Sequence, residues 1–183
     1  MSNHVDIIVD DDRWAEAPGF EQWREMVDLL LEATVKAVYD GGMGFCVNLL
    51  LTGHSVIRTL NLDFRGMDSG TNVLSFPQYE SQCIRDLLKD DGATRRLDDT
   101  MVGDIAMSFD DSIAESIRDG VFLWDKCSHL FVHGVLHLFG MDHVNNDEAE
   151  AMERLETEIL EPFGVRDPYV LGTDKQIEKY HDS

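Results

Sequence analysis

Eleven residues, HGVLHLFGMDH at 133–143, constrain the fold of this chain more than any other stretch. His133 and His137 lie four residues apart in an apolar run, so a helix places both side chains on one face, where they can bind one metal ion. Gly140 supplies the left-handed residue that commonly ends a helix, and His143 can then fold back toward the same ion. Three histidines without a fourth protein ligand are typical of a catalytic zinc site with an open coordination position. The segment therefore predicts a buried helix with a zinc site at its end.

Two alternatives accompany this interpretation. Any one of these histidines taken alone is more often a core or surface residue than a ligand, and only the set is specific. The spacing also matches the H-E-x-x-H-x-x-G-x-x-H motif of metzincin proteases, but Gly134 occupies the position of the glutamate that acts as general base. His129 lies one turn before His133 but two turns, about 12 Å, from His137, which predicts a neighbour of the site and not a ligand.

Length and composition predict one folded domain. The chain has 183 residues, of which 43% are hydrophobic, and we expect a single domain over 1–183 with a flexible tail from about residue 171. No window approaches the roughly 20 apolar residues of a membrane span, and no leader-like segment begins the sequence, so we expect a cytoplasmic protein. Three widely spaced cysteines without a CxxC pair imply neither a disulfide framework nor a cysteine zinc site.

The charge balance restricts the possible partners. Fifteen basic residues stand against 36 acidic ones, giving a formal charge of −21, which argues against a general polyanion binder. A local nucleic-acid site remains compatible with the sequence, because residues 54–76 hold two arginines against two aspartates. Arg95 and Arg96 form an adjacent basic pair, for which a solvated loop is favoured over a phosphate contact.

Hydrophobic periodicity predicts alternating strands and helices. Apolar, β-branched segments indicate four strands, at 5–9, 45–51, 71–77 and 102–108. Helical spacing indicates five helices. Three of them span 20–39, 112–118 and 121–139, and another begins after Asn145. The remaining helix begins at the N-cap Thr52 and has Ile57, Leu60 and Phe64 on its inner face. The strand, helix, strand order at the start favours a parallel crossover.

Two segments carry more specific expectations. Gly103 and Asp104 are unusual inside a strand, which often indicates a close approach or a functional edge, and for Asp104 a structural turn is weighed equally. Asn145 and Glu148 form a capping-box-like start for the last helix. Its buried stripe carries Ala149, Met152, Leu155 and Ile159, and its acidic side chains are expected to face water.

Three stretches together resemble one family. They are LNLDFRGMDSGTNVLSFP at 60–77, VGDIAMS at 102–108 and HGVLHLFGMDHVNNDEAEAMERLETEIL at 133–160, and they resemble the YbeY-type endoribonucleases, the rRNA maturation factors. The resemblance implies an α+β fold with a small mixed sheet. The order of elements above is compatible with it, as a mostly parallel four-stranded sheet packed with about five helices.

The resemblance also implies a function. It implies a single-strand-specific, zinc-dependent endoribonuclease, a hydrolase of RNA phosphodiester bonds that acts on the 3′ end of small-subunit rRNA and in ribosome quality control. It implies one zinc ion held by His133, His137 and His143, with Arg65 completing the catalytic set. The implied partners are single-stranded ribosomal RNA and the small ribosomal subunit or its assembly factors. Zinc hydroxide and the RNA 2′-OH both remain open as the nucleophile.

Departures from the family pattern limit this implication. Met67 stands where members often have a lysine, and Ser69 with Gly70 stands where a proline is common. The lost cation predicts weak, salt-sensitive RNA binding. A salt bridge to Asp63 or Asp68 is the alternative role for Arg65. A non-catalytic, zinc-containing ribosome assembly factor is the alternative function, and a zinc metalloprotease is less favoured.

Overall fold

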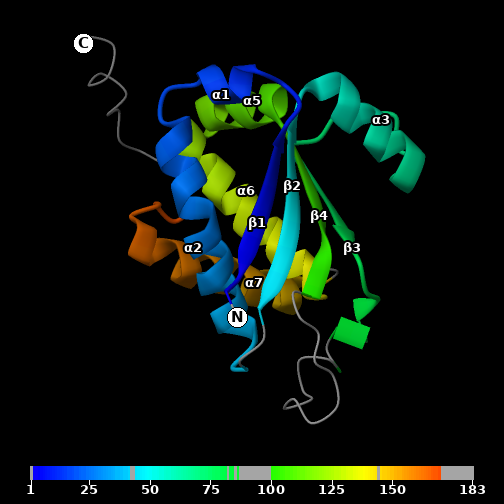
Figure 1. Ribbon diagram of the computed structural model, residues 1–183, viewed down its shortest axis with the longest axis vertical. Helices are drawn as coiled ribbons and strands as arrows, with labels where there is room; N and C mark the ends of the chain where they lie inside the picture. The colour runs from blue at the N-terminus through cyan, green and yellow to red at the C-terminus, as the bar shows by residue number, and fades with distance from the viewer. Residues whose placement is uncertain are drawn as a thin grey trace.

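One four-stranded sheet forms the centre of the molecule. The computed structural model describes residues 2–41, 44–81, 83–84, 86, 100–143 and 145–169. The strands β1 (His4–Val9), β2 (Phe45–Thr52), β4 (Thr100–Ser108) and β3 (Val73–Pro77) are hydrogen-bonded in that spatial order. The first three are parallel to one another, and β3 runs antiparallel to β4 at the edge (Figure 1). This confirms the predicted mixed, mostly parallel sheet.

Helices connect the strands much as the periodicity predicts. They are α1 (Arg13–Glu16), α2 (Phe20–Val38), α3 (His54–Arg65), α5 (Phe109–Asp119), α6 (Leu123–Leu138) and α7 (Asn146–Leu160), followed by a 3-10 turn at Glu161–Phe163. All five predicted helices are present, and the short α1 is an addition. Asn145 is the N-cap of α7, because its side-chain oxygen accepts a hydrogen bond from the backbone N–H of Glu148.

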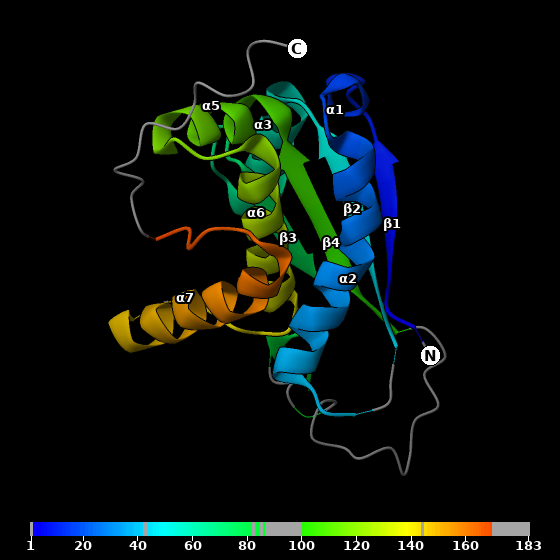
Figure 2. The same ribbon diagram turned by 90° about the vertical axis from the view of Figure 1, so that its left-hand side faces the viewer.

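One face of the sheet is covered by α2 and α6, and α7 packs against both helices from outside (Figure 2). Alternate residues of β2 point into this layer, and Phe45, Val47, Leu49 and Leu51 are fully buried there. The helix α6 is apolar on most of its surface because it lies between the sheet and α7. The main hydrophobic core therefore surrounds the helix that carries His133 and His137.

All three tryptophans of the chain meet near the start of α6. The Trp124 ring lies 5.3 Å from that of Trp23 in α2 and 6.3 Å from that of Trp14 in α1, centroid to centroid. The buried indole N–H groups are paired, because Trp14 donates to the carbonyl of Thr52 and Trp23 donates to Ser128. This aromatic cluster joins α1 and α2 to the amino-terminal turns of α6.

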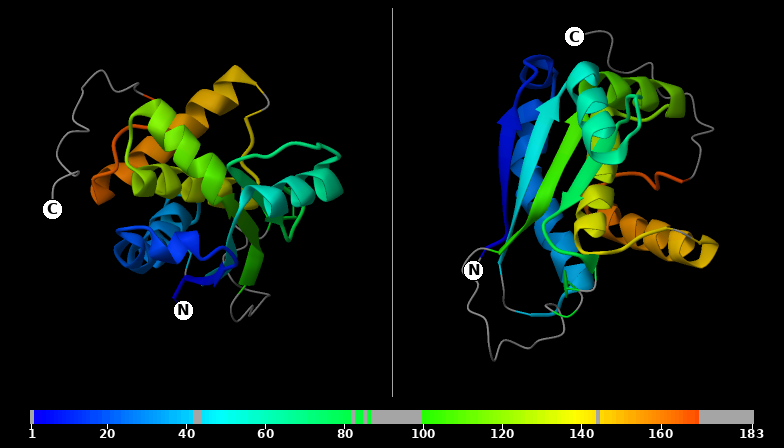
Figure 3. Two further views of the ribbon diagram at one scale, coloured as in Figure 1. Left: turned by 90° about the horizontal axis from the view of Figure 1, so that it is seen from above. Right: turned by 90° about the vertical axis from the view of Figure 1, so that its right-hand side faces the viewer.

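The opposite face of the sheet is only partly covered. The helix α3 packs there through Ile57 onto Leu74 and Ala106, beside the β3 and β4 end of the sheet (Figure 3). Phe64 was expected on the inner face of this helix, but 69% of it is exposed. The prediction is wrong because an open groove separates the last turn of α3 from the sheet, and Phe64 lines this groove with its ring edge-on to that of Phe76.

The start of α3 also differs from the prediction. The N-cap residue is Gly53, and Thr52 is the last residue of β2. The Thr52 hydroxyl donates a 2.6 Å hydrogen bond to Asp10, which follows β1, and so it is not available to cap the helix. Arg95, Arg96 and the tail from about residue 171 lie outside the described residues. Within the described residues the three cysteines form no disulfide, and no helix there is long and apolar enough to cross a membrane.

Candidate functional site

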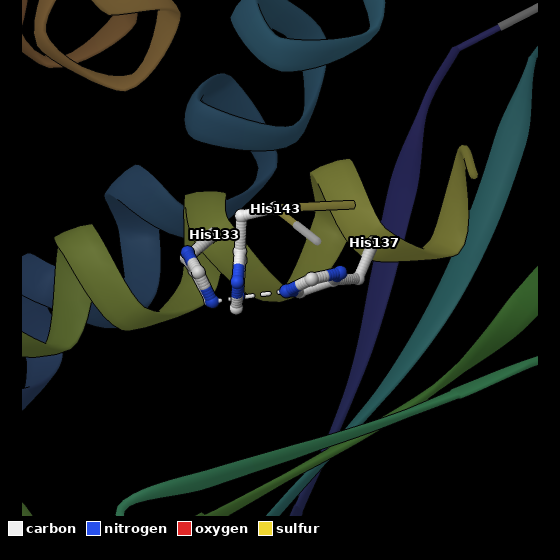
Figure 4. Close-up of side chains that lie close together, drawn as sticks. All are labelled: His133, His137 and His143. Atoms are coloured by element: carbon white, nitrogen blue, oxygen red, sulfur yellow. Dashed lines mark hydrogen bonds between the residues drawn. The ribbon is translucent and has the colours of Figure 1, made fainter. Parts of the chain in front are cut away.

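The local backbone brings the third histidine back to the first two. Gly140 adopts a left-handed φ of 79°, and its N–H donates to the carbonyl of His137. This closes α6 as predicted, because glycine takes the left-handed conformation without a side-chain clash. The chain then reverses, so that His143 lies beside the helix it has just left (Figure 4).

The three predicted ligands form one cluster. One ring nitrogen from each of His133, His137 and His143 lies within 4.8 Å of the others, and the Nε2 atoms of His133 and His137 are 3.0 Å apart. Tetrahedral zinc with nitrogen ligands at about 2.0–2.1 Å separates those nitrogens by about 3.3 Å. His133 and His137 are partly buried and His143 is exposed, so the cluster opens to solvent on one side.

Hydrogen bonds at the Nδ1 atoms of His133 and His137 determine the tautomers of the two rings. The Nδ1 of His137 lies 2.9 Å from the Met141 carbonyl, and the Nδ1 of His133 lies 2.8 Å from Glu156 Oε1. Both partners are acceptors, so each Nδ1 carries a hydrogen, and in the neutral ring each Nε2 has a free lone pair. Two lone pairs facing each other at 3.0 Å repel unless a cation lies between them. Burial, and then the proximity of His133, lower the pKa of His137, which favours the neutral form that binds metals. The donor set therefore fits a divalent metal ion.

Glu156 is the residue that the sequence analysis missed. The acidic side chains of α7 were expected to face water, but Glu156 is fully buried and accepts hydrogen bonds from His133, His129 and Tyr169. Burial raises the pKa of its carboxyl group. The three hydrogen bonds together have the larger effect and lower the pKa to about 2. The sequence did contain a signal for this burial. Glu156 lies four residues after Met152, so a helix places it on the same buried stripe.

His129 lies beside the cluster of three histidines, as predicted. Its Nε2 is 2.9 Å from Glu156 Oε2 and 3.2 Å from the Tyr169 hydroxyl, and its ring lies 6.2 Å from that of His133. Burial, followed by the hydrogen bond to Glu156, raises the pKa of Tyr169, which keeps this hydroxyl a donor. His129 forms an alternative grouping with His133 and Glu156, but its Nε2 is engaged by the carboxylate.

Gly134 has a packing role. A Cβ atom on this residue would lie 3.0 Å from Ile105 Cδ1 and 3.0 Å from Ser75 Oγ, so α6 touches β3 and β4 at this point. A glutamate here would drive its side chain into Ile105 and Ser75 of the sheet. This packing argues against a metzincin-like proteolytic mechanism.

Arg65 is placed apart from the histidine cluster. It is the last residue of α3, it is exposed, and no hydrogen bond or ion pair joins it to the three histidines among the described residues. The alternative salt bridge to Asp68 is wrong, because Arg58 holds that carboxylate with two hydrogen bonds of 2.6 and 2.9 Å. Within the described residues, Asp63 forms no ion pair with Arg65 either. In the described part of the chain the Arg65 guanidinium has no acidic partner.

Gly103 and Asp104 have different roles. A Cβ on Gly103 would lie 2.4 Å from the carbonyl oxygen of Phe76, so the predicted close approach is confirmed. Asp104 lies within β4 and not in a turn, and it accepts a 2.7 Å hydrogen bond from Asn48 of β2. Its side chain lines a groove under α3 on the sheet face opposite α6.

Known proteins are similar to this chain in sequence. The family model described as Endoribonuclease YbeY matches residues 10–164. The curated protein named Endoribonuclease YbeY from Bradyrhizobium sp. (strain BTAi1 / ATCC BAA-1182) is 39% identical over 166 residues, covering 90% of this chain and 91% of that one. The protein of the same name from Maricaulis maris (strain MCS10) is 36% identical over 167 residues, covering 91% and 92%.

The structural comparison agrees on the fold. A solution structure of a Thermotoga maritima protein superposes with a TM-score of 0.54 at 20% identity, covering 94% of this chain and all of that one. The family model spans most of the chain and includes Arg65 and all three clustered histidines. The chain belongs to the Endoribonuclease YbeY family.

Proposed function

We propose that this chain is a zinc-dependent endoribonuclease, folded as one domain over residues 1–183, that cuts single-stranded RNA. Its proposed substrate is ribosomal RNA at the 3′ end of the small subunit, in the cytoplasm, with a further role in ribosome quality control. The proposed partners are the small ribosomal subunit or its assembly factors. Membership of the Endoribonuclease YbeY family supports the RNA-cleaving activity.

The observation that carries the proposal is the convergence of His133, His137 and His143. Two Nε2 lone pairs face one another at 3.0 Å, and the third histidine joins them from the segment after Gly140. A zinc ion held there would polarise a phosphoryl oxygen or acidify a bound water. Three ligands leave a coordination position open, and the exposure of His143 leaves that side accessible to a substrate.

Arg65 is proposed to hold the scissile or a neighbouring phosphate. A guanidinium without an acidic partner in the described residues is available for a bidentate pair with phosphate oxygens. That pair positions the RNA and stabilises negative charge as the phosphodiester bond is attacked. Arg65 ends α3, on the sheet face opposite α6, so the RNA would pass around the β3 edge of the sheet to reach both Arg65 and the histidines.

The test is cleavage of matched single-stranded and duplex rRNA fragments by the zinc-loaded protein. His137→Ala removes one proposed ligand, and Arg65→Glu reverses the charge of the proposed phosphate contact. We expect the wild type alone to cut, with a preference for the single strand, and each variant to lose at least about 100-fold in rate. Arg65→Glu should retain zinc content and melting temperature, because Arg65 makes no ion pair with the described residues.

A control variant separates the site from contaminating nucleases. Arg24→Glu places the same charge change on an exposed residue of α2 and should cut like the wild type. Equal cutting by His137→Ala would refute the metal site as the nuclease centre. Zinc binding without cleavage by any of the proteins would favour the alternative of a non-catalytic assembly factor.

A further inference from the structure

We propose that Glu156 is a positioning residue, whose buried carboxylate fixes the His133 ring for metal binding while His129 and Tyr169 hold that carboxylate in place. The inference rests on the metal site of the proposed function and adds a layer of residues behind it. It concerns metal affinity, so it is separable from RNA cleavage.

The geometry places Glu156 behind only one of the three clustered histidines. Its Oε1 lies 2.8 Å from the Nδ1 of His133, which leaves the Nε2 of that ring pointing into the cluster. A carboxylate behind a ligating histidine fixes the tautomer and orientation of the ring and raises its basicity toward the metal. The outer nitrogen of His137 is held instead by a backbone carbonyl, so side-chain substitution can test the His133 support alone.

The carboxylate itself is held from the other side. Its Oε2 accepts from His129 Nε2 at 2.9 Å and from the Tyr169 hydroxyl. Three hydrogen bonds on one fully buried carboxylate leave little freedom to rotate. Tyr169 lies beyond the end of α7. The Glu156 carboxylate therefore links the segment after the 3-10 turn to α6.

Substitution by glutamine should break this arrangement without a change of volume. An amide has one acceptor oxygen, so Gln can accept from His133 or from the His129 and Tyr169 pair, but not from both. When the amide NH₂ faces the Nδ1 of His133, that nitrogen becomes the acceptor and the hydrogen moves to Nε2. The nitrogen that should bind the metal then carries a proton.

The experiment measures zinc affinity by competition with a chromogenic chelator, and the tautomer of the His133 ring in the metal-free protein by ¹⁵N NMR. We expect Glu156→Gln to bind zinc about 10- to 100-fold more weakly than the wild type and to populate the Nε2–H form of His133. The matched control is Glu158→Gln, which changes an exposed glutamate of the same helix and should bind zinc within about twofold of the wild type.

The inference is overturned if Glu156→Gln binds zinc like the wild type, or if its His133 keeps the hydrogen fully on Nδ1. If Glu156→Gln does not fold, Tyr169→Phe decides, since it removes a single donor to Oε2. A loss of zinc affinity clearly larger than about twofold would support the inference, and a change within about twofold would overturn it. Wild-type protein that binds no zinc would overturn the metal site and this inference together, whereas zinc binding without RNA cleavage counts against the proposed nuclease activity alone.

Discussion

Glu156 is a buried carboxylate that stays ionised because three hydrogen-bond donors surround it. Burial alone would make the neutral acid the favoured form. The donors come from α6 and from the segment after α7, so ionisation of this one group depends on two parts of the chain being packed together. The charge is therefore linked to folding.

This linkage gives a pH prediction. The pKa of Glu156 is about 2 in the folded protein against an ordinary 4.5, so its contribution is complete well above pH 4.5 and is lost as the pH falls toward 2. We expect the metal-free wild type to lose about 2 kcal/mol more unfolding free energy between pH 6 and pH 3 than Glu156→Gln does. Urea denaturation of both proteins with chelator present measures the difference, and equal losses would contradict the prediction.

At the scale of the element, β4 depends on a glycine at its most crowded point. Gly103 has a φ of 150° and lies against the backbone carbonyl of Phe76, which cannot move without disturbing the β3 and β4 ladder. We expect Gly103→Ala to cost about 1–3 kcal/mol of unfolding free energy, through overlap and backbone strain.

The control for this substitution is Gly120→Ala. Gly120 also has a positive φ, of 68°, but nothing lies within 4 Å of a Cβ placed there. It should cost only the left-handed strain of about 1 kcal/mol. Urea midpoints compare the two, and a smaller cost at Gly103 than at Gly120 would show that the ladder accommodates the methyl group.

The elements themselves could be predicted because their signals are local. The helix α6 follows from a long apolar run closed by Gly140, and the cluster follows from three histidines close in sequence. Phe64 could not be placed, because periodicity identifies an apolar stripe but not how closely each turn of the helix approaches the sheet. Glu156 was missed for a similar reason, since burial of a carboxylate depends on partners that lie 23 and 27 residues away in sequence.

At the scale of the whole molecule, charge limits how RNA can be held. The formal charge is −21, and the exposed Met67 follows Arg65 where a second cation is common in the family. Only one or two phosphates should therefore be neutralised. We expect the logarithm of the affinity for single-stranded RNA to fall with the logarithm of salt concentration with a slope of about 0.7–1.4.

The variant Arg65→Gln should reduce that slope by about 0.7, because it removes one phosphate contact. Binding titrations of a catalytically blocked protein, such as His137→Ala, at several salt concentrations provide the measurement. High affinity that does not change with salt would show that the interface depends on contacts other than phosphate pairing.

All three tryptophans lie at one end of α6, which determines what the intrinsic fluorescence of this protein can measure. Every indole fluorophore senses the packing of α1, α2 and the start of α6, and Trp124 stacks on Trp23 closely enough for their excited states to interact. His133 lies nine residues farther along the same helix, about 13.5 Å away. Metal bound at that end is expected to change the emission only if it moves α6 or α2 at the tryptophan contacts, so intrinsic fluorescence reports helix movement and not metal occupancy itself.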